Sequence, residues 1–403
     1  SRGRRRGVLL LGEACRSASL ACFSEQKHAT NDGLYNDLPM AEQAQTPRPI
    51  VILGPTAGGK SELAVALAER CAKERGVAGE VIGADSMQIY RQMDAGTAKP
   101  SADQRARATH HLIDIVEPTE RFTVADWLAR ADALLENLPK RGITPIVVGG
   151  TNLYLKALLE GMFEGPPIDE ELRESLQALS TEELREKLVA IDADAAERIH
   201  FNDRKRTIRA IEVFEQTGKR ISELQTQWEG GGEGQGPGAK GQGQGDRRQA
   251  TVGNPQSAIR NPQSTYRYNP ILLGLHWPVE AINPRINHRV KEMFFPTDCG
   301  LICESLPDES RRLESAGLLG PQARKALGYQ QVLDAVAGRC SMDDAFEQTK
   351  ILTRRFAKTQ RTWLKRFLGV HWLDASTLAP QALAETAWQA VAASESVRST
   401  TTD

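Results

Sequence analysis

The sequence has few of the residues that would mark a membrane protein, a disulfide-built protein or a zinc protein. No apolar run approaches the roughly 20 residues that a transmembrane helix needs, so we expect no membrane partner. The 403 residues include only six cysteines, and Cys299 and Cys303 have no second Cys or His pair nearby to complete a zinc site. We therefore expect reduced thiols and a soluble protein located in the cytoplasm.

An excess of charge of one sign is also absent. The 51 basic and 52 acidic residues give a net charge of -1, which by itself says nothing about partners. A nucleic-acid partner has to be argued from local clusters of charge instead. The length allows two domains and a large core, and we expect a monomer.

Residues 54–61, GPTAGGKS, are the most informative segment, because they fit the phosphate-binding pattern G-x-x-x-x-G-K-[ST]. The apolar run at 49–53 before them predicts a buried strand, and residues 62–71 behind them have apolar side chains at helical spacing. Strand, glycine-rich loop and helix therefore occur in the order that a phosphate-binding loop (P-loop) requires.

The residue types in this loop are suited to binding a polyphosphate. Its glycines let backbone N–H groups turn toward phosphate oxygens, and the helix N-terminus behind them adds partial positive charge. Lys60 supplies a full charge, and the Ser61 hydroxyl can be a ligand of Mg²⁺ bound to the same phosphates, so we predict Mg²⁺ as cofactor. The predicted phosphate-binding residues are Gly54, Pro55, Thr56, Ala57, Gly58, Gly59, Lys60 and Ser61.

Two segments have compositions that predict no packed core. Residues 1–48 open with an arginine cluster and a short apolar run, and we interpret them as a disordered extension or an over-extended reading frame rather than a targeting peptide. Residues 229–268 begin with nine glycines in 17 positions and continue with a repeated Asn-Pro-Gln-Ser, so we expect a disordered insert.

Between these segments apolar runs alternate with helical patterns. The runs at 49–53, 80–84, 143–148 and 271–275 predict the strands of an α/β fold, a nucleotide-kinase-like parallel sheet with helices on both faces. We assign this core to 49–168 and 270–395. Residues 169–228 change to charged helices at 170–179, 181–190 and 203–217, which predict an inserted all-helical subdomain.

Polar side chains follow the predicted strands at their carboxyl ends, where open α/β sheets bind ligands. Asp85 opens the string DSMQIY, which continues as MDAGTAKP at 93–100. HHLID stands at 110–114, FTVADW at 122–127 and GGTNLY at 149–154. Each string alone is a weak signal, because an isolated polar residue at a strand end is more often a cap than a catalyst.

Taken together and in this order, the strings resemble the tRNA dimethylallyltransferases, also called the IPP transferase family, in their bacterial form. The resemblance continues through NDRKRTIRAIEVF at 202–214, ALGYQ at 326–330 and TRRFAKTQRTW at 353–363, and it covers about residues 49–228 and 270–375. It implies transfer of a dimethylallyl group from dimethylallyl diphosphate to N6 of adenine 37, beside the anticodon of tRNAs that read codons beginning with U.

That reaction assigns roles to residues. The N6 amine is a poor nucleophile because its lone pair is delocalised into the ring, so we predict Asp85 as the general base. Negative charge develops on the departing diphosphate, which Lys60, a magnesium ion on Ser61 and the loop amides would stabilise. The resemblance adds Thr56 and Arg289 as further diphosphate contacts, although residues 294–300 depart from the family's usual run.

The tRNA partner is expected at two basic clusters and near Asp85. A helix at 353–367 has no acidic residue; we expect its basic face (354, 358, 361 and 365) to be free for phosphate and its apolar face (Phe356, Trp363 and Phe367) to dock on the core. Adenine 37 has to flip out of its stack to reach a buried Asp85. The predicted tRNA-binding residues are Asp85, Ser86, Met87, Gln88, Thr151, Lys205, Arg206, Thr207, Ile208, Arg209, Lys325, Ala326, Leu327, Gly328, Tyr329 and Gln330.

Two other functions fit the P-loop alone. A kinase would transfer phosphate from ATP to a small metabolite without tRNA. A non-catalytic RNA-binding protein would bind tRNA and leave it unmodified. The string at 85–100, together with the two basic clusters, favours the transferase, because neither alternative requires these features in this order.

Overall fold

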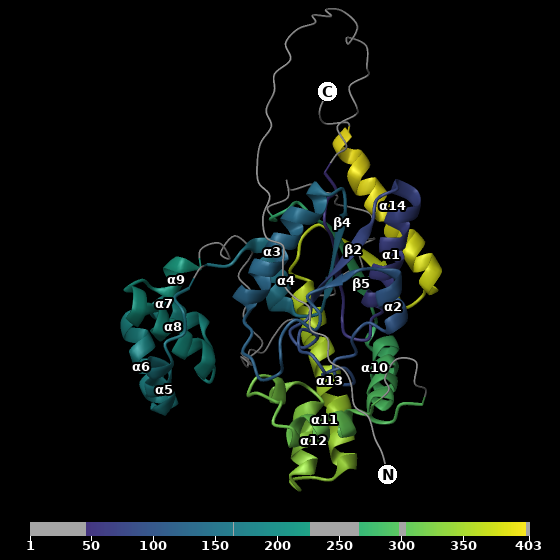
Figure 1. Ribbon diagram of the computed structural model, residues 1–403. Helices are drawn as coiled ribbons and strands as arrows, with labels where there is room; N and C mark the ends of the chain where they lie inside the picture. Colours follow the sequence, from purple (N-terminus) through teal and green to yellow (C-terminus); the bar gives the residue numbers. More distant parts are fainter. Residues whose placement is uncertain (1–45, 164, 226–265, 298–303, 400–403) are drawn as a thin grey trace, which may run out of the picture. The chain divides into compact units, whose positions relative to one another are not determined.

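The structure, a computed structural model, describes residues 46–163, 165–225, 266–297 and 304–399 (Figure 1). Most of the predicted extension and of the predicted insert therefore lies outside the described residues. At both borders the structure is more ordered than expected. Arg48 donates hydrogen bonds to the carbonyls of Asn269 (2.8 Å) and Ser394 (2.8 Å), and the Arg267 amide bonds to the Leu159 carbonyl at 2.8 Å.

A parallel sheet forms the centre of the described chain. Its six strands lie in the order β3-β2-β4-β1-β5-β6, and each neighbouring pair is parallel. The strands are β1 (Ile50–Leu53), β2 (Gly79–Ala84), β3 (His110–His111), β4 (Thr144–Gly149), β5 (Ile271–His276) and β6 (Val370–Asp374). The predicted parallel α/β fold is confirmed.

The central strands are apolar because helices cover both faces of the sheet. All four residues of β1 are buried, and they pair with β4 on one side and β5 on the other. Figure 1 shows α1 (Lys60–Arg75) and α14 (Pro380–Ser399) on one side of the strands, and α3 (Val124–Lys140) and α4 (Asn152–Glu160) on the other. The four predicted strands correspond to β1, β2, β4 and β5, whereas β3 and β6 were not predicted because neither contains an apolar run.

The remaining helices of this part are α2 (Ala102–Arg107), α10 (Val279–Phe294), α11 (Leu306–Ser315), α12 (Tyr329–Val336) and α13 (Met342–Leu364). No described helix is both long and apolar enough to cross a membrane. Cys71 and Cys340, the cysteines among the described residues, are free thiols, as expected.

Phe367, just after the end of α13, is 5% exposed and packs in the core as predicted, but the predicted docking face of α13 was wrong at Phe356. The buried positions in the second half of the helix are Thr353, Ala357, Gln360 and Leu364, at helical spacing, whereas Phe356 is 44% exposed. The apolar pattern misled because three small or polar side chains pack on the core here.

Residues 170–224 form five helices with a separate apolar core. They are α5 (Glu170–Ala178), α6 (Thr181–Ile191), α7 (Ala193–Arg198), α8 (Arg204–Thr217) and α9 (Ile221–Leu224). Leu184, Leu188 and Ile211 are fully buried at its centre. The short helices α7 and α9 were not predicted.

A buried carboxylate ties α5 to α8. Glu212 has no exposed surface, and its two oxygens accept from Nε and Nη2 of Arg173 at 2.5 and 2.6 Å. Arg209 adds a longer contact of 3.3 Å from Nη1. Removing Glu212 leaves the partly buried charges of Arg173 and Arg209 without compensation.

We therefore expect Glu212→Ala to lower the free energy of unfolding by about 3 kcal/mol, measured by urea denaturation of the whole chain. The control is Glu215→Ala on the same helix, whose ion pair with Lys187 is exposed and should contribute less than about 1 kcal/mol. Equal effects of the two variants would show that burial of Glu212 has no special weight.

Candidate active site

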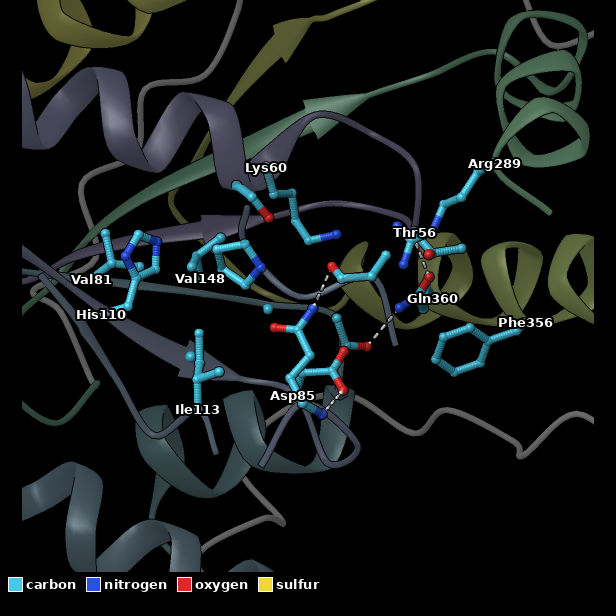
Figure 2. A pocket seen from close by; sticks show the side chains of 17 residues that line it. Thr56, Lys60, Val81, Asp85, His110, Ile113, Val148, Arg289, Phe356 and Gln360 are labelled. Atoms are coloured by element: carbon cyan, nitrogen blue, oxygen red, sulfur yellow. Dashed lines mark hydrogen bonds between the residues drawn. The ribbon is translucent and has the colours of Figure 1, made fainter. Parts of the chain in front are cut away.

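A cavity of about 70 Å³ lies at the carboxyl ends of β1, β2 and β4 (Figure 2). The P-loop, the segments that follow β2 and β4, and helices α10 and α13 all contribute to it. Its polar lining consists of Thr56, Lys60, Ser61, Asp85, Gln88, His110, Arg289 and Gln360, and its apolar lining includes Val81, Ala98, Pro100, Ile113, Val148 and Phe356. The structure thus brings the four predicted catalytic residues, Asp85, Lys60, Thr56 and Arg289, to one cavity.

The P-loop has the backbone conformation that anion binding requires. Gly59 caps α1 with φ of 85° and provides no side-chain hydrogen bond, so the N–H groups of the first turn remain available to a ligand. Ala57 also adopts a left-handed φ of 59°, which is unusual for a residue with a Cβ. Such backbone strain is typical of functional loops that surrounding contacts hold in place.

Two cations share this cavity. Burial lowers the pKa of Lys60 from 10.5 to about 8; the charge of Arg289 acts in the same direction, and Asp85 opposes it. Burial also lowers the pKa of Arg289, again opposed by Asp85. Without a ligand, Lys60 Nζ donates to the Pro55 carbonyl at 2.8 Å. A bound anion would compensate both cations, so the cavity is suited to a polyphosphate.

Asp85 is held by its own loop. Its Oδ1 accepts from the backbone N–H groups of Met87 (2.8 Å) and Gln88 (3.3 Å), which fixes the orientation of the carboxylate. Within the described part of the chain, no hydrogen bond to Oδ2 is found. Figure 2 shows this carboxylate and the Lys60 ammonium directed toward the same space. Asp85 can therefore accept a proton from a group placed beside the P-loop.

Thr151 lies beside this carboxylate rather than in the lining of the cavity. Its Oγ1 accepts from the Ser86 N–H at 3.1 Å and so joins the segments that follow β2 and β4. Of the predicted string 85–88, Asp85 and Gln88 line the cavity.

Gln360, Phe356 and His110 are among the lining residues that were not predicted as site residues. Gln360 on α13 is 1% exposed; its Oε1 accepts from the Thr56 N–H at 2.8 Å, and its Nε2 donates to the Gly150 carbonyl at 2.8 Å. It therefore joins the P-loop to the end of β4. Gln360 lies on the same helical face as Thr353 and Ala357, which are buried. This spacing is a signal that could have indicated Gln360. Phe356 lines the cavity from the same helix.

The third is His110, whose Nδ1 lies 2.7 Å from the Ala108 carbonyl. Burial lowers its pKa, and the charges of Arg105 and His111 act in the same direction against the Ala108 bond. Because a carbonyl only accepts, the neutral ring carries its hydrogen on Nδ1. The Nε2 atom is buried without a hydrogen-bond partner among the described residues.

The predicted tRNA contacts divide by exposure. Lys205 and Arg206 on α8 are exposed, whereas Thr207 and Ile208 are 3% and 7% exposed and pack inside the helical insertion. Arg209 is paired with Glu212 and donates to the Pro166 carbonyl at 2.8 Å. The Thr207 and Ile208 side chains face the core of the insertion, because one amphipathic helix directs them inward; their contact with tRNA stays a prediction.

The same division holds before and within α12. Ala326, Gly328 and Tyr329 are buried, and their place in the tRNA site stays a prediction. Lys325 is exposed, and Leu327 and Gln330 are partly exposed. Gln330 Nε2 donates to Asp334 on the same helix at 3.1 Å.

The oxygen donors of the cavity fit Mg²⁺ that arrives with a phosphate ligand. Among the described residues no cluster of three or more His, Cys, Asp or Glu side chains could hold a metal by itself. The Ser61 hydroxyl and the Asp85 carboxylate line the same cavity. This agrees with the preference of Mg²⁺ for few protein ligands, several waters and substrate phosphates.

Comparisons with known proteins agree with this geometry. The family model described as IPP transferase matches residues 88–240 and 246–367. The chain belongs to the IPP transferase family.

Several IPP transferase relatives match most of the chain. A tRNA dimethylallyltransferase of Geobacter sulfurreducens is 38% identical over 341 residues, which are 83% of this chain and 94% of the relative. One of Geobacillus thermodenitrificans is 38% identical over 334 residues, 82% of this chain and 91% of the relative. The solved tRNA isopentenylpyrophosphate transferase of Bacillus halodurans superimposes with a TM-score of 0.56 at 30% identity, covering 87% of this chain and 99% of that one.

The lowered pKa of Lys60 predicts how anion binding depends on pH. Only the ammonium form attracts phosphate, so affinity for inorganic diphosphate should decrease as the pH rises through about 8, by up to about tenfold per pH unit. Isothermal titration calorimetry from pH 6.5 to 9.5 measures this. Lys60→Arg, which stays charged over that range, is the control and shows the titration of diphosphate itself. Parallel profiles for the two proteins would contradict the assignment.

Proposed function

We propose that this chain transfers a dimethylallyl group from dimethylallyl diphosphate to N6 of adenine 37, in tRNAs that read codons beginning with U. The observation that supports it most strongly is the placement of Lys60 and Arg289 around one cavity with Asp85. The cations are suited to binding the diphosphate of the donor, and the carboxylate is suited to accepting a proton from the amine of the acceptor. The relatives' names, tRNA dimethylallyltransferase, agree with this division.

The donor binds through its diphosphate at the P-loop. The free N–H groups of α1, the Lys60 ammonium and the Arg289 guanidinium compensate its charge, and Thr56 lines the same wall. Mg²⁺, bound through Ser61 and the phosphates, would stabilise the charge on the leaving group. The apolar wall of Val148 and Ile113 offers a surface for the hydrocarbon chain.

The transfer is a substitution at carbon. The N6 lone pair attacks C1 of the allyl group while the bond between C1 and the diphosphate oxygen breaks, and diphosphate leaves with the bonding electrons. Charge then increases on the oxygens that Lys60 and Arg289 face, so these cations stabilise the transition state more than the bound donor. Asp85 accepts the proton that N6 loses, which leaves neutral N6-dimethylallyladenosine.

The acceptor reaches Asp85 as a single extruded base. An adenine stacked in an anticodon loop cannot enter a cavity between P-loop and sheet, so it must leave its stack first. The phosphates around it meet exposed cations: Arg355 and Lys358 on α13, Lys365 just after its end, and Lys205 and Arg206 on α8. Two predicted members of the α13 face are held internally, since Arg354 bonds to Asn287 at 2.6 Å and Arg361 to the Trp277 carbonyl at 3.4 Å.

The test is incubation of the protein with dimethylallyl diphosphate, Mg²⁺ and unmodified tRNA, followed by digestion and nucleoside mass spectrometry. An added five-carbon group on adenosine is expected. Phosphate transfer from ATP without tRNA would favour the kinase instead, and tRNA binding without modification would favour the RNA-binding protein.

Asp85 gives a sharper prediction. Asp85→Asn preserves an oxygen for the Met87 and Gln88 amides but removes the base, so kcat should fall by about 10² to 10⁴ while tRNA affinity stays nearly constant. Rates come from single-turnover assays and affinity from filter binding. The matched control is Asp103→Asn, whose exposed carboxylate lies outside the cavity and should leave turnover intact. A normal rate for Asp85→Asn would exclude its role as base.

A further inference from the structure

Residues 93–100 form a segment, here called the wall, of which Ala98 and Pro100 line the cavity. Its carbonyl groups hold two of the polar side chains of the cavity. Gln88 Nε2 donates to the carbonyls of Thr97 and Ala98, both at 3.1 Å. Arg289 Nη2 lies 3.4 Å from the Thr97 carbonyl. The position of this wall therefore sets where Arg289 and Gln88 stand in the cavity.

The backbone of this wall is strained and closely packed. Ala98 has a left-handed φ of 46°, which a residue with a Cβ rarely adopts. Gly96 has no room for a side chain, because an added Cβ would lie 2.3 Å from Cε2 of Tyr329. A strained loop keeps one conformation only where its surroundings over-determine it, so the contacts behind it carry functional weight.

Those contacts converge on one buried carboxylate. Glu309 on α11 is 2% exposed, and its Oε2 accepts from the N–H groups of Asp94 (2.9 Å) and Ala95 (3.0 Å). Its Oε1 accepts from the Tyr329 hydroxyl at 2.5 Å, and that hydroxyl accepts in turn from the Gly96 N–H at 3.3 Å. Three consecutive backbone N–H groups of the wall thus donate to Glu309 or to the Tyr329 hydroxyl that Glu309 orients.

We propose that Glu309, together with Tyr329, is a positioning residue that sets the Thr97 and Ala98 carbonyls and through them places Arg289 at the diphosphate. The inference deepens the function proposed above and rests on it for the identity of the donor. Neither residue touches the reacting atoms. Glu309 suits this role because a carboxylate accepts at both oxygens, whereas an amide of the same shape must present an NH₂ group to one donor.

The test compares Glu309→Gln with a matched control on the same helix. Glu314 forms an exposed ion pair with Arg324 and is not in hydrogen-bond contact with the wall, so Glu314→Gln should behave as wild type. For Glu309→Gln we expect the KM for dimethylallyl diphosphate to rise about tenfold, while the KM for tRNA changes less than twofold. Affinity for inorganic diphosphate with Mg²⁺, measured by calorimetry, should fall by the same factor.

A double-mutant cycle shows whether the effect passes through Arg289. In an Arg289→Lys background, Glu309→Gln should weaken diphosphate binding by less than twofold, because the group that it positions is already changed. Tyr329→Phe is the second variant; it keeps the ring against Gly96, removes the hydroxyl and should weaken diphosphate binding about threefold. It also serves as the test if Glu309→Gln fails to fold.

The results separate this inference from the proposed function. Three results would each overturn the positioning role. They are equal changes in both KM values, a full additive loss in the Arg289→Lys background, or the same loss in Glu314→Gln. Wild-type protein that binds diphosphate but transfers no prenyl group would overturn the proposed function alone, since the calorimetric comparison does not need turnover.

Discussion

The site depends on two positive charges in one cavity that have a single carboxylate to compensate them. Lys60 and Arg289 both have lowered pKa values because burial penalises their charged forms, and the nearest compensating group is one carboxylate, Asp85. A cavity with this imbalance favours an anion that carries more than one charge. The backbone N–H groups at the start of α1 add to the same field. Binding of diphosphate therefore removes an electrostatic cost that the fold itself has created.

The order of the strands explains how residues far apart in the chain meet at that charge. In the order β2-β4-β1, the segments that leave the carboxyl ends are the Asp85 loop, the Gly150 turn and the P-loop. Gln360 closes this group from α13, since one side chain bonds both the P-loop and the Gly150 carbonyl. Asp85 and the P-loop are thus held at one edge of the sheet. In the proposed reaction this edge would keep the nucleophile and the leaving group on a common frame.

Four of the six described strands and the P-loop could be predicted because their signal is local. Runs such as the IVIL of β1 and the glycine pattern at 54–61 need no tertiary information. Gln360 and Glu309 could not be derived in this way, because their hydrogen-bond partners lie 20 to 304 positions away in the chain. His110 could not be derived because its signal is burial of Nε2. The error on Phe356 has the same origin. The helical period was right, but small and polar side chains pack against the core in place of Phe356.

The same charge distribution also accounts for a P-loop that acts at carbon. In a phosphoryl transfer the loop stabilises a group that moves to an acceptor, so the acceptor must approach the terminal phosphorus. Here the one carboxylate of the cavity lies beside the loop lysine, where it offsets that charge and can take a proton from a nucleophile. As the bond from carbon to diphosphate breaks, negative charge increases on the diphosphate and electron density decreases on the amine. The cations compensate the first change and the Asp85 carboxylate compensates the second. In the proposed reaction the cations and Asp85 line one cavity, which is the arrangement that preorganised electrostatic stabilisation requires.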